Sequence, residues 1–422
     1  MEAAWAAVYS AATAVVLDAT GDAYLGGWTN AKDFPTTPGA LDARKGAFDA
    51  DFIAKISADG ASLIYSALLD GGSFGIYSIG VDSSGSVYAG GTTSSADMPV
   101  AGPALQPCAG PSYVAYNFLL KLNPAGTSLE YFSFEDALQH TIGVAPAPDG
   151  SLVEAAGLVR KFTSLDAAGD PYLSPLCVLN GASFVSHMQH GQPGISPGEM
   201  VTFKGVGLGP ASGASFSVVN KSVGTFLGGT RVLFDGVAAP LLYTQDRQIN
   251  AIAPYALSGK TQTSIQIESQ GKTSQVVTIP VSPISVAVFT NFQTSVPLVL
   301  NQDFSLNSVD NPVARGSAIV LLVTGAGQTS PPTMDGQVLQ SAGGLQANVT
   351  ARLDNVYISP VDLAISVLYA GPAPGLVSAV QQINVQIPAD LPSYFLSGVP
   401  TGHNLLLVTI GTQSIAVPAM IR

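Results

Sequence analysis

A tandem repeat in the first 175 residues constrains the fold more than any other feature of the 422-residue sequence. The segment DATGDAYLGGWT, which begins at Asp18, recurs as DSSGSVYAGGTT at Asp82, an offset of 64. The segment FIAKISADG, which begins at Phe52, recurs as FLLKLNPAG at Phe118, and a weaker third copy begins at Gly143. A period of this length, built from short strands, is typical of propeller blades or stacked β-repeats.

Each repeat is predicted to form strands joined by tight turns. The Asp-x-x-Gly segments are turn sequences, because the Asp side chain bonds its own backbone and Gly accepts a positive φ. Around Phe52 the residues alternate, so Phe52, Ala54 and Ile56 are expected on one face and Ile53 and Lys55 on the other.

These motifs resemble the bacterial SBBP β-propeller repeat, in which an Asp-x-x-Gly-x-x-Tyr-x-x-Gly strand pair precedes a Phe-x-x-Lys-Leu hairpin. About two and a half units precede residue 175, whereas closed propellers typically have about four to eight blades. Because an open stack leaves unpaired edges, we expect the missing blades to be supplied by sequence upstream of Met1.

A different duplication occupies the remainder of the chain. VGLG at Val206 aligns with TGAG at Thr324, and QINAIAP at Gln248 aligns with QINVQIP at Gln382. Ile383, Val385 and Ile387 alternate with polar residues, which predicts a half-buried strand. The continuous apolar runs 318–323 and 405–408 predict strands that are buried on both faces.

This half resembles an uncharacterised C-terminal domain found in many proteins of soil acidobacteria. The resemblance rests on NGASF, on PGEMVTFKGVGLGP, on LVLNQDFSLNSVDNPVARGSAIVLLVTGAGQTSP and on LYAGPAPGLVSAVQQINVQIPADLPS. It departs from the family at 353–356, where a paired Gly is more usual. The resemblance implies two TIG-like sandwiches at the end of large exported proteins, and it implies no catalytic residues.

The sequence therefore predicts an all-β protein, with a partial β-propeller of two to three blades followed by two tandem immunoglobulin-like β-sandwiches. The expected domains are 1–175 for the propeller-type repeats, 176–286 for the first sandwich and 287–422 for the second.

Charge is scarce, at 10% of residues, with a net charge of −12. No basic patch is available for a phosphate backbone, so a nucleic-acid partner is not expected. Ala3–Leu17 is uncharged but spans only 15 residues, which is too short to cross a bilayer. It also lacks the basic start of a secretion signal. Membrane insertion is therefore not expected.

No constellation of residues predicts catalysis, a cofactor or a metal. Ser73 and Ser196 sit in Gly-x-Ser-x-Gly segments without the strand and helix that a nucleophile elbow needs. His187 and His190 are interpreted as solvated loop residues, because no third ligand accompanies them. Acidic pairs such as Glu135 and Asp136 fix no carboxylate separation.

Aromatic residues in the repeats are the remaining candidates for ligand binding. Tyr24, Trp28 and Tyr88 would stack on sugars if they are exposed at a propeller rim, or pack between blades if they are not. Cys108 and Cys177 either form one disulfide in an exported protein or remain two buried thiols.

Together these features predict a non-catalytic extracellular or cell-surface protein for binding or adhesion. Its expected partners are polysaccharide or a surface protein, bound through propeller loops and sandwich faces. Two alternatives remain open, namely a propeller-based hydrolase or lyase that acts on polysaccharide and a purely structural surface spacer. A fold alone does not decide among them.

Overall fold

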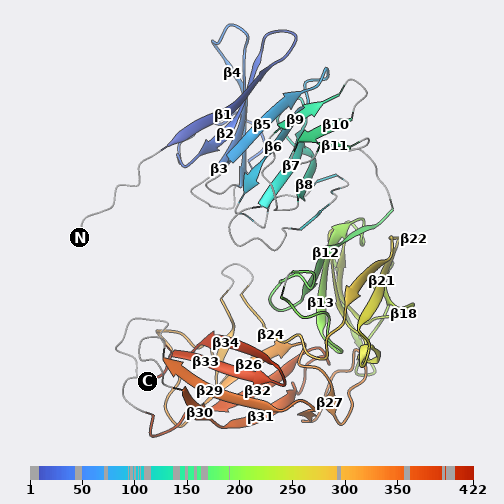
Figure 1. Ribbon diagram of the computed structural model, residues 1–422, viewed down its shortest axis with the longest axis vertical. Coiled ribbons are helices and arrows are strands. Elements are labelled where there is room, and N and C mark those ends of the chain that lie inside the picture. The colour runs from blue at the N-terminus through green and yellow to red at the C-terminus, as the bar shows by residue number, and fades with distance from the viewer. Residues whose placement is uncertain are drawn as a thin grey trace, which may run out of the picture. The chain divides into compact units, whose positions relative to one another are not determined.

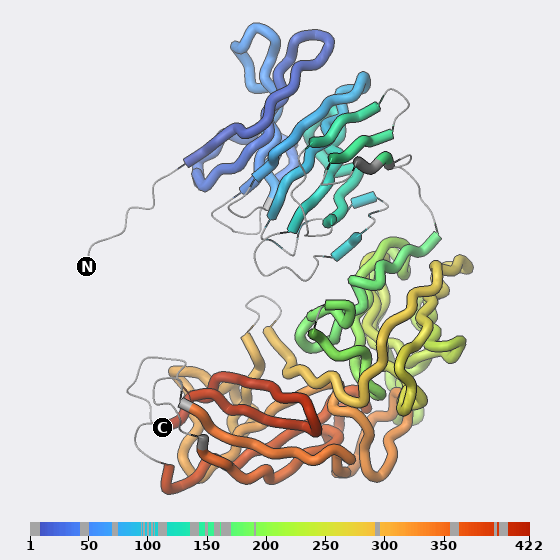
Figure 2. Tube along the Cα trace, viewed as in Figure 1, coloured from blue at the N-terminus to red at the C-terminus, as the bar shows by residue number. Residues whose placement is uncertain are grey.

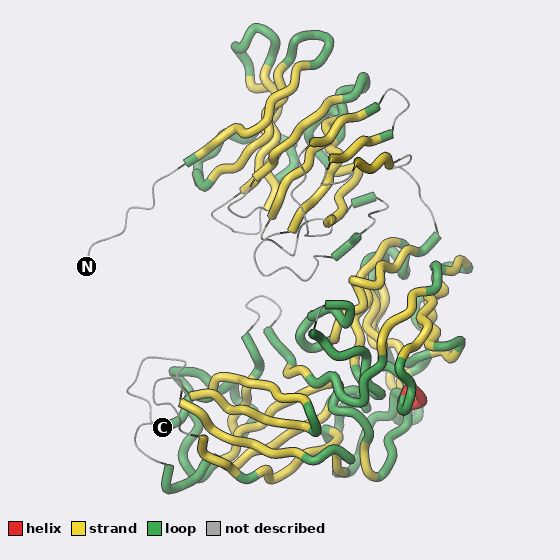
Figure 3. Tube along the Cα trace, viewed as in Figure 1, coloured by secondary structure: helices red, strands yellow, loops and turns green. Residues whose placement is uncertain are grey.

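The computed structural model describes residues 9–42, 50–70, 75–93, 95, 98, 101–102, 104, 106–108, 116–135, 143–147, 151–155, 159–162, 170–189, 191–291, 296–355, 362–391, 395 and 404–422. Their regular structure is antiparallel β-strand apart from short 3-10 turns such as Tyr255–Leu257 (Figure 3). The predicted all-β class is confirmed. The chain divides into two compact units, Met1–Cys177 and Val178–Arg422 (Figure 1).

Three antiparallel sheets make up the first unit, and they follow one another in chain order from blue to green (Figure 2). The first sheet has β1 (Ser10–Leu17), β2 (Ala23–Thr29), β3 (Ala50–Ile56) and β4 (Leu63–Asp70). The second has β5 (Gly75–Val81), β6 (Val87–Thr93), β7 (Tyr116–Leu122) and β8 (Leu129–Glu135). The third has β9 (Gly143–Pro146), β10 (Leu152–Ala155) and β11 (Val159–Phe162).

The sequence repeat is repeated in backbone detail. The pairing of β1 with β2 shifts register between Ala12 and Ala14, and the pairing of β5 with β6 shifts between Ile76 and Ser78, 64 residues later. The turn chemistry repeats too, because the carboxylates of Asp18 and Asp82 each accept hydrogen bonds from backbone N–H groups two and four residues later. The predicted Asp-x-x-Gly turns are confirmed.

A buried apolar core joins the first sheet to the second, and a smaller one joins the second to the third. The larger core comes from alternate residues of facing strands, which is how sheets pack face to face. Its largest side chains are Tyr24, Tyr65, Phe118, Phe132 and Phe134.

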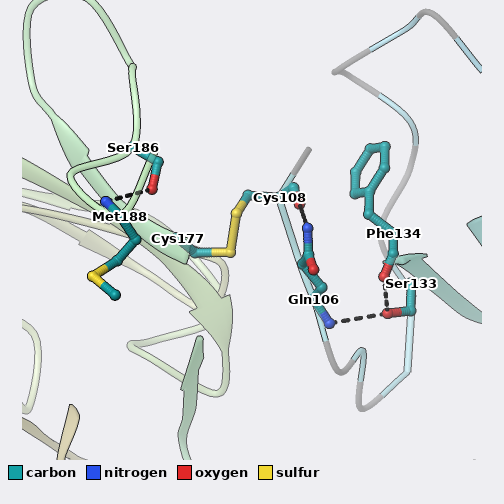
Figure 4. Close-up of a disulfide and its surroundings, with 7 residues drawn as sticks. All are labelled: Gln106, Cys108, Ser133, Phe134, Cys177, Ser186 and Met188. Carbon is teal, nitrogen blue, oxygen red and sulfur yellow. Dashed lines mark hydrogen bonds between the residues drawn. A yellow bond between two sulfur atoms is a disulfide. The ribbon is translucent and has the colours of Figure 1, made fainter. Parts of the chain in front are cut away.

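A disulfide joins Cys108 to Cys177, the last residue of the first unit (Figure 4). Both cysteines are buried. The segment before Cys108 is held to β8, because the Gln106 N–H donates to Ser133 Oγ at 2.9 Å. Cys177 lies in β12 (Tyr172–Asn180), which continues from the first unit into the second.

The first half of the second unit contains two five-stranded sheets, ordered β12-β13-β20-β19-β14 and β18-β17-β21-β22 with β23 paired to β21. Phe203 of β13 packs edge to face on Phe234 of β17, with ring centroids 6.2 Å apart. The strands are β13 (Met200–Val206), β14 (Ala214–Ser215), β17 (Thr230–Phe234), β18 (Val237–Ala238), β19 (Leu241–Gln245), β20 (Gln248–Ile252), β21 (Gln262–Ser269), β22 (Lys272–Thr273) and β23 (Val277–Pro280).

The second half repeats this plan with sheets ordered β24-β26-β32-β31 and β30-β29-β33-β34 over one shared core. Its main strands are β24 (Ala287–Val288), β25 (Val299–Asn301), β26 (Ala318–Thr324), β29 (Val349–Asn355), β30 (Asp362–Ile365), β31 (Val367–Pro372), β32 (Gln381–Gln386), β33 (Asn404–Ile410) and β34 (Gln413–Pro418). A small two-stranded sheet pairs β27 (Thr329–Ser330) with β28 (Gly344–Leu345).

The two apolar runs predicted to be fully buried behave differently. In β26 six of the seven residues are buried, as expected. In β33 only Leu406, Val408 and Ile410 are buried, while Leu405 and Leu407 are half-buried. The prediction for 405–408 is therefore wrong, because one face of this strand lies on the core and the other does not.

Hydrogen bonds connect the two halves of the second unit. The Met200 N–H donates to Thr324 Oγ1 at 2.7 Å, and the Tyr255 N–H donates to an Asp335 carboxylate oxygen at 2.8 Å. Partial burial of Tyr255 raises the pKa of its phenol to about 12. The hydroxyl therefore stays protonated, and it donates to the Ser378 carbonyl at 3.2 Å.

None of the helices in the described part of the chain has the length and hydropathy that a bilayer span requires.

Candidate functional site

A two-residue hairpin in the second unit carries a cluster of exposed apolar side chains. Its strands are β15 (Val218–Val219) and β16 (Ser222–Val223), and the connecting residues Asn220 and Lys221 have φ values of 51° and 60°. Two successive left-handed residues are typical of a type I′ turn, which matches the twist of a hairpin. A non-glycine residue such as Lys221 adopts this conformation at a cost of about 1 kcal/mol, so its surroundings must fix it.

Backbone bonds from a distant segment fix the hairpin. The Val223 N–H donates to the Gly336 carbonyl at 2.9 Å, and the Val338 N–H donates to the Lys221 carbonyl at 2.8 Å. Strand β16 is therefore bonded on both sides. In the part of the chain that the structure describes, β15 pairs only with β16, so its other side forms an edge.

An apolar pocket of about 270 Å³ opens beside this hairpin. Leu241 and Val223, both buried, form its floor. Phe216 and Phe226 line it and expose 41% and 60% of their surfaces. The other lining residues are Ser217, Val219, Ser222, Gly224 and Leu227. Exposed apolar residues gathered around a concavity are unusual on a soluble protein and mark interaction sites.

Phe226 is held in place from one side. The Arg231 guanidinium lies 4.9 Å from the centroid of its ring, a cation–π contact. Arg231 also pairs with Glu268, at 3.4 Å between Nη1 and Oε2. These contacts orient the ring without covering it, since Phe226 remains 60% exposed.

The nine described residues that line the pocket include no titratable side chain. General acid–base or nucleophilic chemistry needs such groups within hydrogen-bond reach of the reacting atoms. The site can desolvate an apolar or aromatic group and offer hydroxyl and backbone hydrogen bonds at its rim.

The three aromatic residues predicted as weak ligand-binding candidates lie in the first unit. Tyr24 and Tyr88 are 0% and 3% exposed, so neither ring offers a face to a ligand. Trp28 is half-buried beside Gly75, where an added Cβ would lie 3.0 Å from its Cδ1. These placements favour the packing role over sugar stacking.

Each of the two tyrosines belongs to a repeated polar cluster. The hydroxyl of Tyr24 donates to Asp18 at 3.1 Å, and Lys55 Nζ lies 4.7 Å from the centroid of the Tyr24 ring. Hydrogen bonds from Thr20, above all, hold the pKa of Asp18 well below its usual range. In the second repeat, Tyr88 donates to Asp82 at the same distance. The clusters brace turns against strands and form no open site.

His187 was expected to be a solvated loop residue, and the structure corrects this. The side chain is 4% exposed, and its Nε2 lies 2.9 Å from Oε1 of Glu199, which is fully buried. Burial alone would lower the pKa of His187, but the Glu199 carboxylate and the Pro193 carbonyl raise it further than burial lowers it. Glu199 also accepts hydrogen bonds from Asn180 Nδ2 and the Ser196 N–H, so the group is a buried structural hub.

Several other sequence candidates lie outside the described residues, namely Ser73, Asp136 and His190. Ser196 is buried and its N–H is bonded to Glu199, so it is not placed as a nucleophile. Among the residues that the structure describes, no group of three or more His, Cys, Asp or Glu side chains could hold a metal ion.

The pocket is a site that the sequence analysis missed. Its signal was present in SFSVVNKSVGTF, which begins at Ser215 and places apolar residues on both sides of an Asn-Lys pair. Hydrophobic runs around a turn dipeptide predict a hairpin. They do not reveal that its apolar side chains stay exposed, because that depends on what packs against it.

Comparison with known proteins supplies little further information. No family model matches the chain, and no curated protein matches it. Among solved structures, the plexin A4 full extracellular region with domains 1 to 8 aligns over 98% of this chain and 56% of its own length, at 7% identity and a TM-score of 0.18. A plexin A4 structure with domains 1 to 10 aligns over 98% and 48%, with the same identity and TM-score. This chain spans about half the length of those plexin chains, and TM-scores this low support no statement about fold or function.

Proposed function

We propose that this protein is a non-catalytic binding or adhesion protein, located outside the cell or on its surface, and that the pocket beside the β15–β16 hairpin is its contact site. The observation that carries the proposal is the exposed Phe216 and Phe226 around an apolar concavity without titratable groups. Aromatic anchors in a pocket are typical of the energetic centres of protein interfaces.

The disulfide between Cys108 and Cys177 supports the proposed location. Disulfides persist in oxidising compartments and are rare in the cytosol. Both thiols are buried, so a reductant reaches the bond only when the surrounding segment opens.

We further propose that residues 1–175 form part of a β-propeller, and that 176–286 and 287–422 are immunoglobulin-like sandwiches. The face-to-face stacking of three consecutive sheets supports the first assignment. Facing sheets supply the core of the 287–422 region, and the Phe203–Phe234 contact spans the two sheets of the 176–286 region. Antiparallel sheets packed in pairs are the plan of that fold.

We propose a protein partner that inserts an apolar or aromatic side chain into the pocket. The volume of about 270 Å³ suits one large side chain, and the edge of β15 offers backbone groups to an extended peptide. A polysaccharide partner would call for more polar groups than the serine hydroxyls at this rim.

A peptide library displayed on phage and panned against the full chain tests the proposal. Peptides that carry aromatic or branched apolar residues should be enriched, and Phe226→Ser should weaken their binding by about 10- to 30-fold. Val237→Ser is the matched control, since Val237 is 57% exposed in another hairpin.

Three outcomes would redirect the assignment. Enriched peptides that bind Phe226→Ser and the unaltered chain equally would remove the pocket from the function. Binding on a glycan array that is lost in Phe226→Ser would replace the protein partner with a polysaccharide. If neither library yields a binder, the spacer role becomes the better account of the molecule.

A further inference from the structure

Every sheet of the first unit has two faces that can be compared between repeats. In the first sheet, we call the A face the one that carries the cross-strand pair Leu25 and Ala54. In the second sheet, the A face carries the corresponding pair Ala89 and Leu120. The B face is the opposite one. It carries Tyr24 in the first sheet and Tyr88 in the second.

Inside the unit, an A face always packs on the B face of the preceding sheet. The A face of the second sheet shares a core with the B face of the first. In the same way, Val144 and Leu152 on the A face of the third sheet share a core with the B face of the second. At the first of these contacts, an added Cβ on Gly26 would lie 3.7 Å from Cδ1 of Ile79.

The A face of the first sheet has no sheet of the described chain upon it. Val15 is 63% exposed, whereas its counterpart one repeat later, Ile79, is 9% exposed. Leu17 is 62% exposed, whereas its counterpart Val81 is half-buried. A loop covers the other part of this face, because Phe34 stacks on Phe52 at 4.6 Å. An apolar face that is buried in one repeat is thus open in the other.

The B face of the third sheet is the matching open end. Its described side chains are Ala145 and Lys161, which are exposed, and Val153 and Ala155, which are half-buried. Val153 stands in register with Lys161 of β11. Tyr24 of β2 pairs with Lys55 of β3 in the same way, so the third sheet has the same cross-strand register as the first. Each chain therefore presents one open A face and one open B face.

We propose that a second copy of this chain fills both openings. The B face of the third sheet in the first copy packs on the A face of the first sheet in the second copy. The B face of the third sheet in the second copy packs in the same way on the A face of the first sheet in the first copy. Such head-to-tail contacts close into a ring when the rotation allows it. Two copies supply six sheets, which lies within the roughly four to eight blades of closed propellers. The inference rests on the stacking of the sheets and is independent of the pocket.

The mass of the full chain in solution tests the proposal. Light scattering at about 100 µM, far above a micromolar dissociation constant, should give twice the 43.0 kDa of one chain. The double variant Val15→Asp with Leu17→Asp should weaken the dimer by about 100-fold. Val237→Asp, an equally exposed site in the second unit, should leave the dimer unchanged.

Cross-linking identifies which faces meet. By analogy with Gly26 and Ile79, Ala155 of one copy should lie beside Val15 of the other. A mixture of Val15→Cys chains with Ala155→Cys chains should form one disulfide between unlike chains on mild oxidation. Val15→Cys chains alone should form none through that residue, and peptide mapping distinguishes either product from the Cys108–Cys177 bond.

Three results would overturn the proposal. If the chain is a monomer at about 100 µM, a second copy does not cover the open A face, and repeats encoded elsewhere in the polypeptide would have to cover it. A dimer that survives the double Asp variant would be held by another surface. A Val15→Cys product between identical residues would show two A faces meeting in place of an A face and a B face. The peptide-binding assay of the pocket is unaffected by each of these results, so the two proposals fail separately.

Discussion

Side-chain hydrogen bonds to near neighbours occur in both units, but bonds that span more than a hundred residues are found in the second unit. In the first unit, the Val144 N–H donates to Ser78 Oγ across 66 residues. Asp18 and Tyr24 are six residues apart, as are Asp82 and Tyr88. In the second unit, Asn180 donates to the Ser285 carbonyl 105 residues away, and Met200 donates to Thr324 across 124 residues. Local bonds make each repeat partly self-sufficient, whereas distant bonds tie the whole second unit into one cooperative body.

The two units can be followed by separate probes. Both tryptophans, Trp5 and Trp28, precede Cys177, so intrinsic tryptophan fluorescence reports the first unit alone. Hydrogen exchange read by mass spectrometry reports each segment of the second unit.

Glu199→Ala should have the largest effect and should be confined to the second unit. It leaves His187, Asn180 and the Ser196 N–H without their shared acceptor. The loss of one partner of a buried charged pair costs about 3–5 kcal/mol. Exchange should accelerate in peptides from both halves of this unit, while the tryptophan transition stays in place. Acceleration restricted to residues near 199 would contradict the idea of one cooperative body.

Removal of the disulfide should have a large effect in the first unit. The bond closes a loop of 69 residues, and the chain-entropy model gives about 4 kcal/mol for a loop of this length. Cys108→Ser with Cys177→Ser should therefore lower the urea midpoint of the tryptophan transition. Addition of a thiol reductant to the unaltered chain is the second test. A midpoint that neither change moves would mean that the bond constrains nothing.

Tyr24→Phe and Tyr88→Phe should each have a small effect of equal size. Each removes one hydroxyl that donates to a carboxylate at 3.1 Å, which is worth about 1–2 kcal/mol. Because the clusters belong to different repeats, the double variant should show the sum to within about 0.5 kcal/mol. Strong non-additivity in urea titrations would show that the repeats are not energetically modular.

The pH dependence of the second unit should be the most gradual effect. The folded pKa of His187 is raised above 6.5. The His187–Glu199 pair therefore contributes its full stability below pH 6.5 and loses it as the pH rises through the folded pKa. Exchange protection in the second unit, corrected for the intrinsic rise of the exchange rate with pH, should fall over that window. His187→Gln should abolish the slope, and a slope that persists in this variant would assign it to another group.

Sequence reasoning succeeded where the cause of the structure is local. The Asp18 and Asp82 turns, and the alternation that places Ile383 and Val385 on the core, depend on neighbouring residues alone. It failed where the cause is distant. Twelve residues separate His187 from the buried Glu199 that partners it, and no periodicity links them.

The candidate site failed to emerge for a related reason. Phe216 and Phe226 look like ordinary core residues in the sequence. They stay exposed because the hairpin is held by residues 336–338, more than a hundred positions away, with its apolar side chains turned outward. Tyr24 and Tyr88, the more obvious aromatic candidates, are each buried by the sheet of the following repeat.

The position of the disulfide has a mechanical consequence for the adhesion function proposed above. Tension that enters the first unit from the second arrives at Cys177 and crosses the sulfur atoms directly to Cys108. The covalent path of the force bypasses the residues between them, including the whole third sheet. These residues correspond to about 230 Å of extended chain, which the force does not stretch while the disulfide is intact. When the unit is unfolded by force under oxidising conditions, only the residues outside the disulfide loop should add to its length. After reduction of the disulfide, the residues of the loop should add their length as well.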